Sequence, residues 1–142
     1  DDDIILNHDA IRPFITHRVI IDNIESGKKN RVSNTVIPTV DTIAISEDLA
    51  TISTIPPKSK MYSEQTPQTF NLRSLVDEYN KIAVEDIEKE NDTARFMLNA
   101  GYTVHFVLGE YSNIKIITAF DLEVAKAFLR RNEDDKQSGT FN

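Results

Sequence analysis

Apolar residues follow two spacings along this chain, and each spacing predicts one kind of element. Short apolar runs, and stretches that alternate apolar with polar residues, predict strands at residues 4–7, 102–109 and 113–118. Apolar residues three or four positions apart predict helices at residues 16–29, 71–84, 91–101 and 118–131. Because strands alternate with helices, we expect a mixed, mainly parallel sheet with helices on its faces, which is a three-layer α/β fold.

Residue types at the ends of these segments support the helix boundaries. Thr16 and Asn71 are suitable N-caps, and Gly27 and Gly101 suit the position just after a helix. Four apolar residues of the last helix are expected to face the core: Leu122, Ala125, Phe128 and Leu129. Residues 132–142 are polar, so we end the domain at residue 131 and expect a disordered tail or a linker beyond it.

Residues 37–60 differ from the rest because prolines interrupt β-prone sequence there. Pro38 lies within the first extended piece and demotes it from a central strand to an edge or bent strand. A second extended piece ends at two prolines, and residues 46–49 are expected to form the turn between the pieces. We therefore expect a protruding β-arm. The following segment, Glu64–Phe70, contains Pro67 and is expected to be a polar loop.

The composition narrows the classes of function. A length of 142 residues fits one domain. The net charge of −7 argues against nucleic acid as the main partner, but a few focused cations can still hold a small anion. No apolar run approaches the roughly 20 residues of a membrane span, and the absence of Cys excludes thiol catalysis and suits a cytoplasmic location. "DDD" leads directly into a core strand, so we expect the N-terminal part of the fold to be missing from this sequence.

Charged residues follow the first strand, where open α/β folds hold their ligands. Asp9 is suited to a divalent cation or a ribose hydroxyl and Arg12 to a phosphate, but both residues also suit a solvated turn. Lys115 lies within an apolar stretch, so it either points to solvent or meets an anion. Thr66 and Gln68 suit a ligand's hydroxyl groups, or an ordinary turn before a helix. Residue types alone leave these alternatives open.

Five motifs, taken in their order along the chain, resemble one enzyme family. They are "HDAIRPFI", "IPTVDTI", "QTPQTF", "ND" before a helix, and "NIKIIT" followed by "DLEVAKAFL". They resemble the cytidylyltransferases that make CDP-alcohols, over nearly all of residues 3–130. "RPFIT", "YSEQTPQTF" and "GEYSNIKI" are most similar to the ribitol-5-phosphate branch, which is close to the 2-C-methyl-D-erythritol 4-phosphate branch. The resemblance implies a Rossmann-like three-layer fold of the nucleotide-diphospho-sugar transferase type, with a β-arm at about residues 37–60.

The resemblance also implies a reaction and the residues that perform it. CMP passes from CTP to a polyol phosphate, here D-ribitol 5-phosphate, giving CDP-ribitol and pyrophosphate with Mg²⁺ as cofactor. Asp9 resembles the residue that meets Mg²⁺ and the nucleotide, Lys115 the lysine at the reacting phosphates, and Lys58 an arginine that assists them. Seven residues resemble substrate contacts: Arg12, Asp41, Thr42, Thr66, Gln68, Asn91 and Asp92. The arm crosses to a second subunit in this family, which implies a homodimer.

Two alternatives to this interpretation stay open. The first is a 2-C-methyl-D-erythritol 4-phosphate cytidylyltransferase of isoprenoid biosynthesis, instead of an enzyme that supplies CDP-ribitol for teichoic acid or capsule. The second is a non-catalytic dimerising fragment or degenerate homologue. It arises because the Gly-rich loop that wraps the CTP phosphates in this family has no match in these residues. We expect the parent protein to be the enzyme and these 142 residues alone to be inactive.

Overall fold

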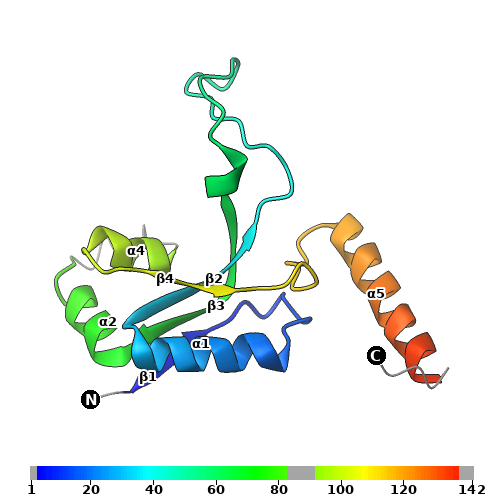
Figure 1. Cartoon of the computed structure of the whole chain (residues 1–142), viewed down its shortest axis with the longest axis horizontal. Helices are drawn as coiled ribbons and strands as arrows, with labels where there is room; N and C mark the ends of the chain where they lie inside the picture. Colours follow the sequence, from blue (N-terminus) through cyan, green and yellow to red (C-terminus); the bar gives the residue numbers. More distant parts are fainter. Residues whose placement is uncertain (1–2, 83–91, 138–142) are drawn as a thin grey trace.

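The computed structural model describes residues 3–82 and 92–137 (Figure 1). The elements in chain order are β1 (Ile4–Asn7), α1 (His17–Lys29), β2 (Val32–Pro38), the short 3-10 turn η1 (Lys58–Lys60), β3 (Tyr62–Asn71), α2 (Leu72–Tyr79), α4 (Thr93–Asn99), β4 (His105–Leu108) and α5 (Ala119–Gln137). The four strands form one sheet in the order β1-β3-β2-β4. Strand β3 is antiparallel to β1 and β2, and β2 is parallel to β4. The sheet is mixed, as expected, but the expectation of a mainly parallel sheet is wrong, because two of the three pairings among the described strands are antiparallel.

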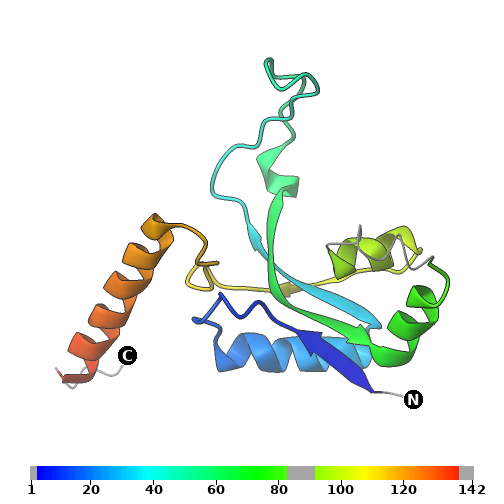
Figure 2. The ribbon, with the colours of Figure 1, turned by 180° about the vertical axis from the view of Figure 1, so that it is seen from behind.

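Helices cover both faces of this sheet, as the three-layer expectation requires. Val32 of β2 packs with Phe70 of β3 against Phe96 and Met97 of α4. The next residue of β2, Ser33, points to the opposite face, where its hydroxyl lies 2.7 Å from that of Ser26 in α1. Successive residues of a strand therefore reach different helices. Figures 1 and 2 show α1 on one face of the sheet, with α2 and α4 on the other.

The structure corrects three expectations about strands. Pro38 does not mark an edge strand, because β2 pairs with β3 on one side and with β4 on the other, although Pro38 itself lies beyond the residues paired with β4. The alternative of a bent strand agrees with a register shift between Asn34 and Val36 in the pairing with β3. The segment Glu64–Phe70 is not a loop but the middle of β3, with a cis peptide bond before Pro67. Residues 113–118 do not form a strand. Their backbone meets the irregular segment after β1, where the N–H of Ile116 donates to the carbonyl of Ile11 (2.9 Å), so no ladder develops.

Most of the expected helix boundaries are confirmed. Thr16 caps α1 through its hydroxyl, and the Asn71 side chain accepts a hydrogen bond from the N–H of Ser74 at the start of α2. Gly101, with a φ of 92°, follows α4 as expected. Gly27, in contrast, lies inside α1, where a Cβ atom would collide with the side chain of Thr69 on β3. The glycine there permits close packing of helix on sheet instead of ending the helix.

The expected arm is present between β2 and β3, and it projects away from the sheet (Figures 1 and 2). One bridge, between Ile45 and Thr54, joins its two sides. Asp48 holds the tip, because its carboxylate accepts hydrogen bonds from the N–H groups of Ala50 and Thr51. The tip thus spans residues 46–53, longer than the turn expected at residues 46–49.

Helix α5 stands apart from the sheet (Figures 1 and 2). Of the four residues expected to face the core, only Ala125 is buried. The ring of Phe128 packs edge-on against that of Phe14, with 4.9 Å between the ring centroids. Leu122 and Leu129 are exposed. The helix continues to Gln137, past the boundary placed at residue 131, because the charged residues there are compatible with a helix. No helix in the described part of the chain is long and apolar enough to cross a membrane.

Candidate functional site at the end of the first strand

A tight turn after β1 directs two charged side chains to one place. The N–H of Arg12 donates to the carbonyl of Asp9 (3.0 Å), so the chain reverses immediately after the strand. The Arg12 guanidinium returns to Asp9, with Nε 3.1 Å from Oδ2. Its Nη1 donates to the carbonyl of Asn113 (2.8 Å), which ties this turn to the segment that carries Lys115.

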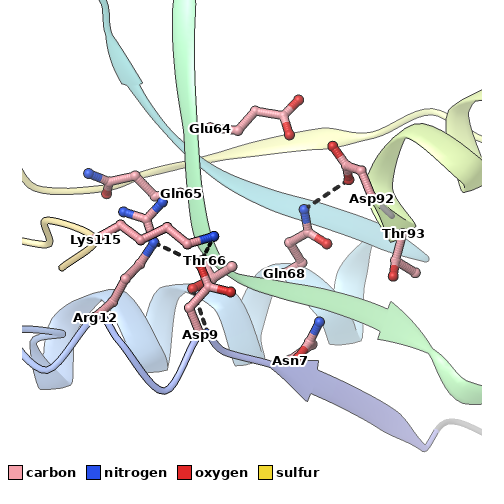
Figure 3. A pocket seen from close by; sticks show the side chains of 10 residues that line it. All are labelled: Asn7, Asp9, Arg12, Glu64, Gln65, Thr66, Gln68, Asp92, Thr93 and Lys115. Atoms are coloured by element: carbon pink, nitrogen blue, oxygen red, sulfur yellow. Dashed lines mark hydrogen bonds and ion pairs between the residues drawn. The ribbon is translucent and has the colours of Figure 1, made fainter. Parts of the chain in front are cut away.

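Lys115 completes a cluster of two cations around one carboxylate, shown in Figure 3. Its Nζ lies 3.2 Å from Oδ2 of Asp9. The Arg12 side chain is 11% exposed and the Lys115 side chain 40%, so Lys115 is the cation that can meet a ligand. The structure shows both alternatives for Lys115, because its side chain is exposed to solvent and its Nζ pairs with the carboxylate of Asp9. We call Asp9, Arg12 and Lys115 the strand-end cluster.

The electrostatics of the cluster favour an ionised Asp9. Partial burial alone would raise the pKa of this carboxyl group. Hydrogen bonds and positive charge from Lys115 and Arg12 outweigh the burial, and the pKa of Asp9 lies below its ordinary value. One negative and two positive charges leave the cluster net positive. It is therefore suited to a phosphate, although the whole chain is acidic.

Strand β3 supplies the opposite wall of this pocket. The backbone N–H of Asp9 donates to Oγ1 of Thr66 (3.0 Å), and Nδ1 of His8 lies 2.9 Å from the same oxygen. Nε2 of His8 lies 3.0 Å from the carbonyl of Arg12, so this ring spans the turn. Asn113, which is buried, donates to the carbonyl of Thr66 (2.8 Å). These bonds fix β3 against the strand-end cluster.

The far side of the pocket is formed where β3 meets the start of α4. Asp92 caps α4, since its Oδ1 accepts from the N–H of Ala94 (3.0 Å), and Nε2 of Gln68 lies 3.3 Å from the same oxygen. The described residues that line the pocket are Asn7, Asp9, Arg12, Glu64, Gln65, Thr66, Gln68, Asp92, Thr93 and Lys115, around a volume of about 230 Å³ (Figure 3).

Six of the site residues expected from sequence are thus together: Asp9, Arg12, Thr66, Gln68, Asp92 and Lys115. Asp41, Thr42 and Lys58 are exposed on or beside the arm and do not line this pocket. Asn91 lies outside the described residues. The roles assigned to all ten residues stay predictions, and the structure gives their positions.

Sequence reasoning missed four further residues that line the pocket: Asn7, Glu64, Gln65 and Thr93. For Glu64 the signal was present, because Glu64, Thr66 and Gln68 are alternate polar residues of one segment. Alternate residues of a strand share a face. Interpreting this segment as a loop removed that periodicity from consideration.

The expected Mg²⁺ stays a prediction, and Asp9 is the residue that would hold it. No group of three or more potential metal-ligating side chains occurs in the parts of the chain that the structure describes. Mg²⁺ is usually held by one or two carboxylates together with substrate phosphates and water, so it needs no such group. Both ion pairs of Asp9 described above use Oδ2, and Oδ1 of the same carboxylate suits a cation.

Solved structures of known enzymes are similar to this chain in sequence and in fold. A 4-diphosphocytidyl-2C-methyl-D-erythritol synthase from Anaerococcus prevotii is 29% identical, with a TM-score of 0.78 over 90% of this chain and 57% of its own. The 2-C-methyl-D-erythritol 4-phosphate cytidylyltransferase from Thermus thermophilus is 28% identical, with a TM-score of 0.75 over 89% of this chain and 62% of its own. The corresponding Francisella tularensis enzyme is 26% identical, with a TM-score of 0.77 over 88% and 58%.

The chain therefore spans 57–62% of the length of these solved relatives. The family model described as IspD, 2-C-methyl-D-erythritol 4-phosphate cytidylyltransferase, matches residues 1–131. That range contains both walls of the pocket and the whole arm. On this match, the chain belongs to the 2-C-methyl-D-erythritol 4-phosphate cytidylyltransferase family.

Proposed function

We propose that the protein carrying this chain transfers CMP from CTP to a polyol phosphate and releases pyrophosphate. The observation that carries the proposal is the strand-end cluster, a net positive group beside a polar pocket in a chain of this family. Because the chain spans 57–62% of its solved relatives, the activity is proposed for the whole protein.

The favoured acceptor is 2-C-methyl-D-erythritol 4-phosphate. The matching family model and the solved relatives carry that substrate in their names. These names favour the alternative acceptor over D-ribitol 5-phosphate, which was our first expectation. Ribitol 5-phosphate stays the second candidate, because "RPFIT", "YSEQTPQTF" and "GEYSNIKI" resemble the ribitol branch.

The chemistry assigned to the cluster is electrostatic. The acceptor's phosphate oxygen attacks the α-phosphorus of CTP, a new P–O bond forms, and the bond to pyrophosphate breaks. Negative charge builds on the phosphate oxygens, and Lys115 lies where it can offset that charge. Asp9 and Arg12 hold Lys115 in place. Mg²⁺, bound with the nucleotide at Asp9, would supply further neutralisation of phosphate charge.

We also propose that the arm joins two subunits into a homodimer. It carries a series of exposed apolar side chains: Val40, Ile43, Ile45, Leu49, Ile52 and Ile55. Exposed apolar residues concentrated on one projecting segment indicate an interaction surface. In such a dimer, Asp41, Thr42 and Lys58 would be available to the partner's acceptor site, and this placement would explain their distance from the pocket of their own chain.

The experiment supplies the whole protein with CTP, Mg²⁺ and equimolar 2-C-methyl-D-erythritol 4-phosphate and D-ribitol 5-phosphate. Pyrophosphate release and the mass of the CDP-alcohol are measured together. We expect CDP-methylerythritol to exceed CDP-ribitol by at least tenfold. The reverse ratio would assign the protein to the ribitol branch. A protein that forms neither product would support the non-catalytic alternative.

A further inference from the structure

Two carboxyl groups face each other at the rim of the pocket. Glu64 comes from β3, Asp92 caps α4, and Figure 3 shows the two side chains converging. Both also line a second, more apolar hollow of about 320 Å³ that includes Val36, Leu98 and Phe106. The carboxyl pair therefore separates the polar pocket of the strand-end cluster from an apolar surface.

Each carboxyl group affects the ionisation of the other, because two ionised carboxylates in contact repel. Burial raises the pKa of Glu64, and the hydrogen bond and negative charge of Asp92 raise it further. A hydrogen bond from Asn34 and the positive charge of Arg95 act in the opposite direction and are outweighed.

Asp92 shows the reverse behaviour. Burial would raise its pKa, but the backbone N–H of Arg95 and the side chain of Gln68 stabilise the ionised form, and the pKa of Asp92 is lowered. Of the two groups, Glu64 is therefore the more readily protonated and Asp92 the more readily ionised. A carboxylate oxygen of either residue accepts a hydrogen bond, and Glu64 donates one when it is protonated.

Asn34 gives an independent indication of a ligand beside this pair. It is 2% exposed, lies on β2 and lines the second hollow together with Glu64 and Asp92. Its Oδ1 is buried and has no hydrogen-bond partner among the described residues. A buried amide oxygen without a donor costs about 1–3 kcal/mol. A group that donates a hydrogen bond here would remove that cost.

We propose that Glu64 is a specificity-determining residue that, with Asp92, binds a hydroxyl group of the acceptor alcohol. The inference rests on the proposed function. A hydroxyl both donates and accepts, so it suits a place where carboxyl oxygens of Glu64 and Asp92 lie beside the unpartnered oxygen of Asn34. A phosphate, which bears negative charge and accepts hydrogen bonds, would be repelled by Asp92.

The position of Glu64 on β3 indicates the direction in which the acceptor alcohol would lie in the pocket. Glu64, Thr66 and Gln68 alternate along the strand and all line the pocket, while Lys115 lies at the end next to Thr66 (Figure 3). An acceptor with its phosphate at Lys115 would therefore extend its carbon chain along β3. Its hydroxyl groups would reach Glu64 and Asp92, at the side away from the phosphate.

The experiment compares wild type, Glu64→Ala and Glu64→Gln in the whole protein by acceptor-dependent pyrophosphate release from CTP. We expect Glu64→Ala to raise the KM for the polyol phosphate about tenfold or more and to leave the KM for CTP unchanged. Glu64→Gln keeps a donor and an acceptor, so its KM should stay within about threefold of wild type. Ethyl phosphate, which has a phosphate but no hydroxyl, should inhibit all three proteins with the same Ki.

Glu123→Ala on α5 is the matched control, because Glu123 is an exposed glutamate away from the pocket. Equal thermal unfolding midpoints for the Glu64 variants exclude misfolding as the cause. If the wild type is active and Glu64→Ala keeps the wild-type KM for the polyol phosphate, the proposed role of Glu64 is wrong. The proposed function would not be affected by that result. A Ki for ethyl phosphate that rises as much as the KM would also overturn the role of Glu64. A wild type that releases no pyrophosphate with any polyol phosphate would overturn the proposed function and this inference with it.

Discussion

The strand-end cluster and the arm differ in whether their side chains have partners within the described part of the chain. In the cluster, Arg12 and Lys115 both meet Asp9, and the turn that holds them is bonded to β3 and to Asn113. In the arm, Leu49 is 94% exposed, and one bridge joins the two sides. The comparison separates a site that one chain preorganises from a surface whose apolar side chains stay uncovered among the described residues, as the proposed dimer interface requires.

This difference has a consequence for function. A preorganised cluster loses no freedom when a phosphate arrives, so its electrostatic contribution is available to the reaction. An arm with few internal contacts gains its order from whatever packs against it. Variants in the cluster should therefore change the chemical step, and variants in the arm should change assembly.

The largest effect is expected for Lys115→Ala, which removes the exposed cation of the cluster. We expect kcat for pyrophosphate release to fall about 100-fold or more, because charge that develops on the phosphates is no longer offset. Lys126→Ala is the control, since Lys126 is exposed on α5 and pairs with Glu123. Equal kcat values for the Lys115 variant and wild type would mean that the cluster is not the reaction centre.

A variant in the arm tests whether the arm forms the dimer interface. Ile52→Asp places a charge among the exposed apolar residues of the arm, and we expect the dimer dissociation constant to rise at least tenfold. Sedimentation over a range of concentrations measures it. Ile21→Asp, on an exposed position of α1, is the control and should dimerise as wild type does. A dimer that tolerates Ile52→Asp would show that the arm is not the interface.

Gly27→Ala tests how closely α1 packs on the sheet. The added Cβ would collide with the buried side chain of Thr69, and we expect a loss of about 1–3 kcal/mol in unfolding free energy that exceeds the gain in helix propensity. Denaturant unfolding measures the difference. Lys28→Ala, a neighbour on the exposed side of the same helix, should change stability by less than about 0.5 kcal/mol. Equal losses in both variants would argue against a packing cause.

The lowered pKa of Asp9 predicts a pH effect on stability. A carboxyl group whose folded-state pKa lies below its unfolded value stabilises the fold above that unfolded value. This contribution is lost as the pH falls through the lowered pKa. The difference in melting temperature between wild type and Asp9→Asn should thus be present at pH 7 and should shrink as the pH falls below about 4. A difference that grows towards acid pH would contradict the ion pairs in the cluster.

The smallest effect is expected for Lys58→Arg on the arm. Arginine keeps the positive charge and adds a two-pronged donor, so acceptor affinity should be preserved or improved by a few-fold. The KM for the polyol phosphate measures this, with Lys60→Arg as the control. A large rise in KM confined to the Lys58 variant would mean that Lys58 does not occupy an arginine-like role.

The sequence predicted those elements whose local signals agree with their tertiary surroundings. Thr16, Asn71 and Gly101 mark helix ends through bonds that extend over a few residues, and local chemistry determines such bonds. Asp9 and Arg12 were candidates because they follow an apolar strand, a position at which ligands bind in this class of fold.

The remaining features depended on distant contacts. Pro67 suggested a loop, but β3 is stabilised by neighbours on both sides that lie far away in the sequence. Residues 113–118 have strand-like composition, yet they meet an irregular segment and form no ladder. The apolar face of α5 suggested a core helix, although only Ala125 is buried among the four residues expected inside. Glu64 was overlooked because its segment was interpreted as a loop, whereas it lies on β3.

The most direct test of the central claim is a crystal structure of the whole protein with Mg²⁺, a non-hydrolysable CTP analogue and 2-C-methyl-D-erythritol 4-phosphate. We predict phosphate oxygens within about 3.2 Å of Lys115 Nζ, and a polyol chain that extends along β3 towards Glu64. Phosphates bound elsewhere, with the Asp9–Lys115 ion pair buried beneath other residues, would contradict the account. The strand-end cluster would then be a structural ion pair.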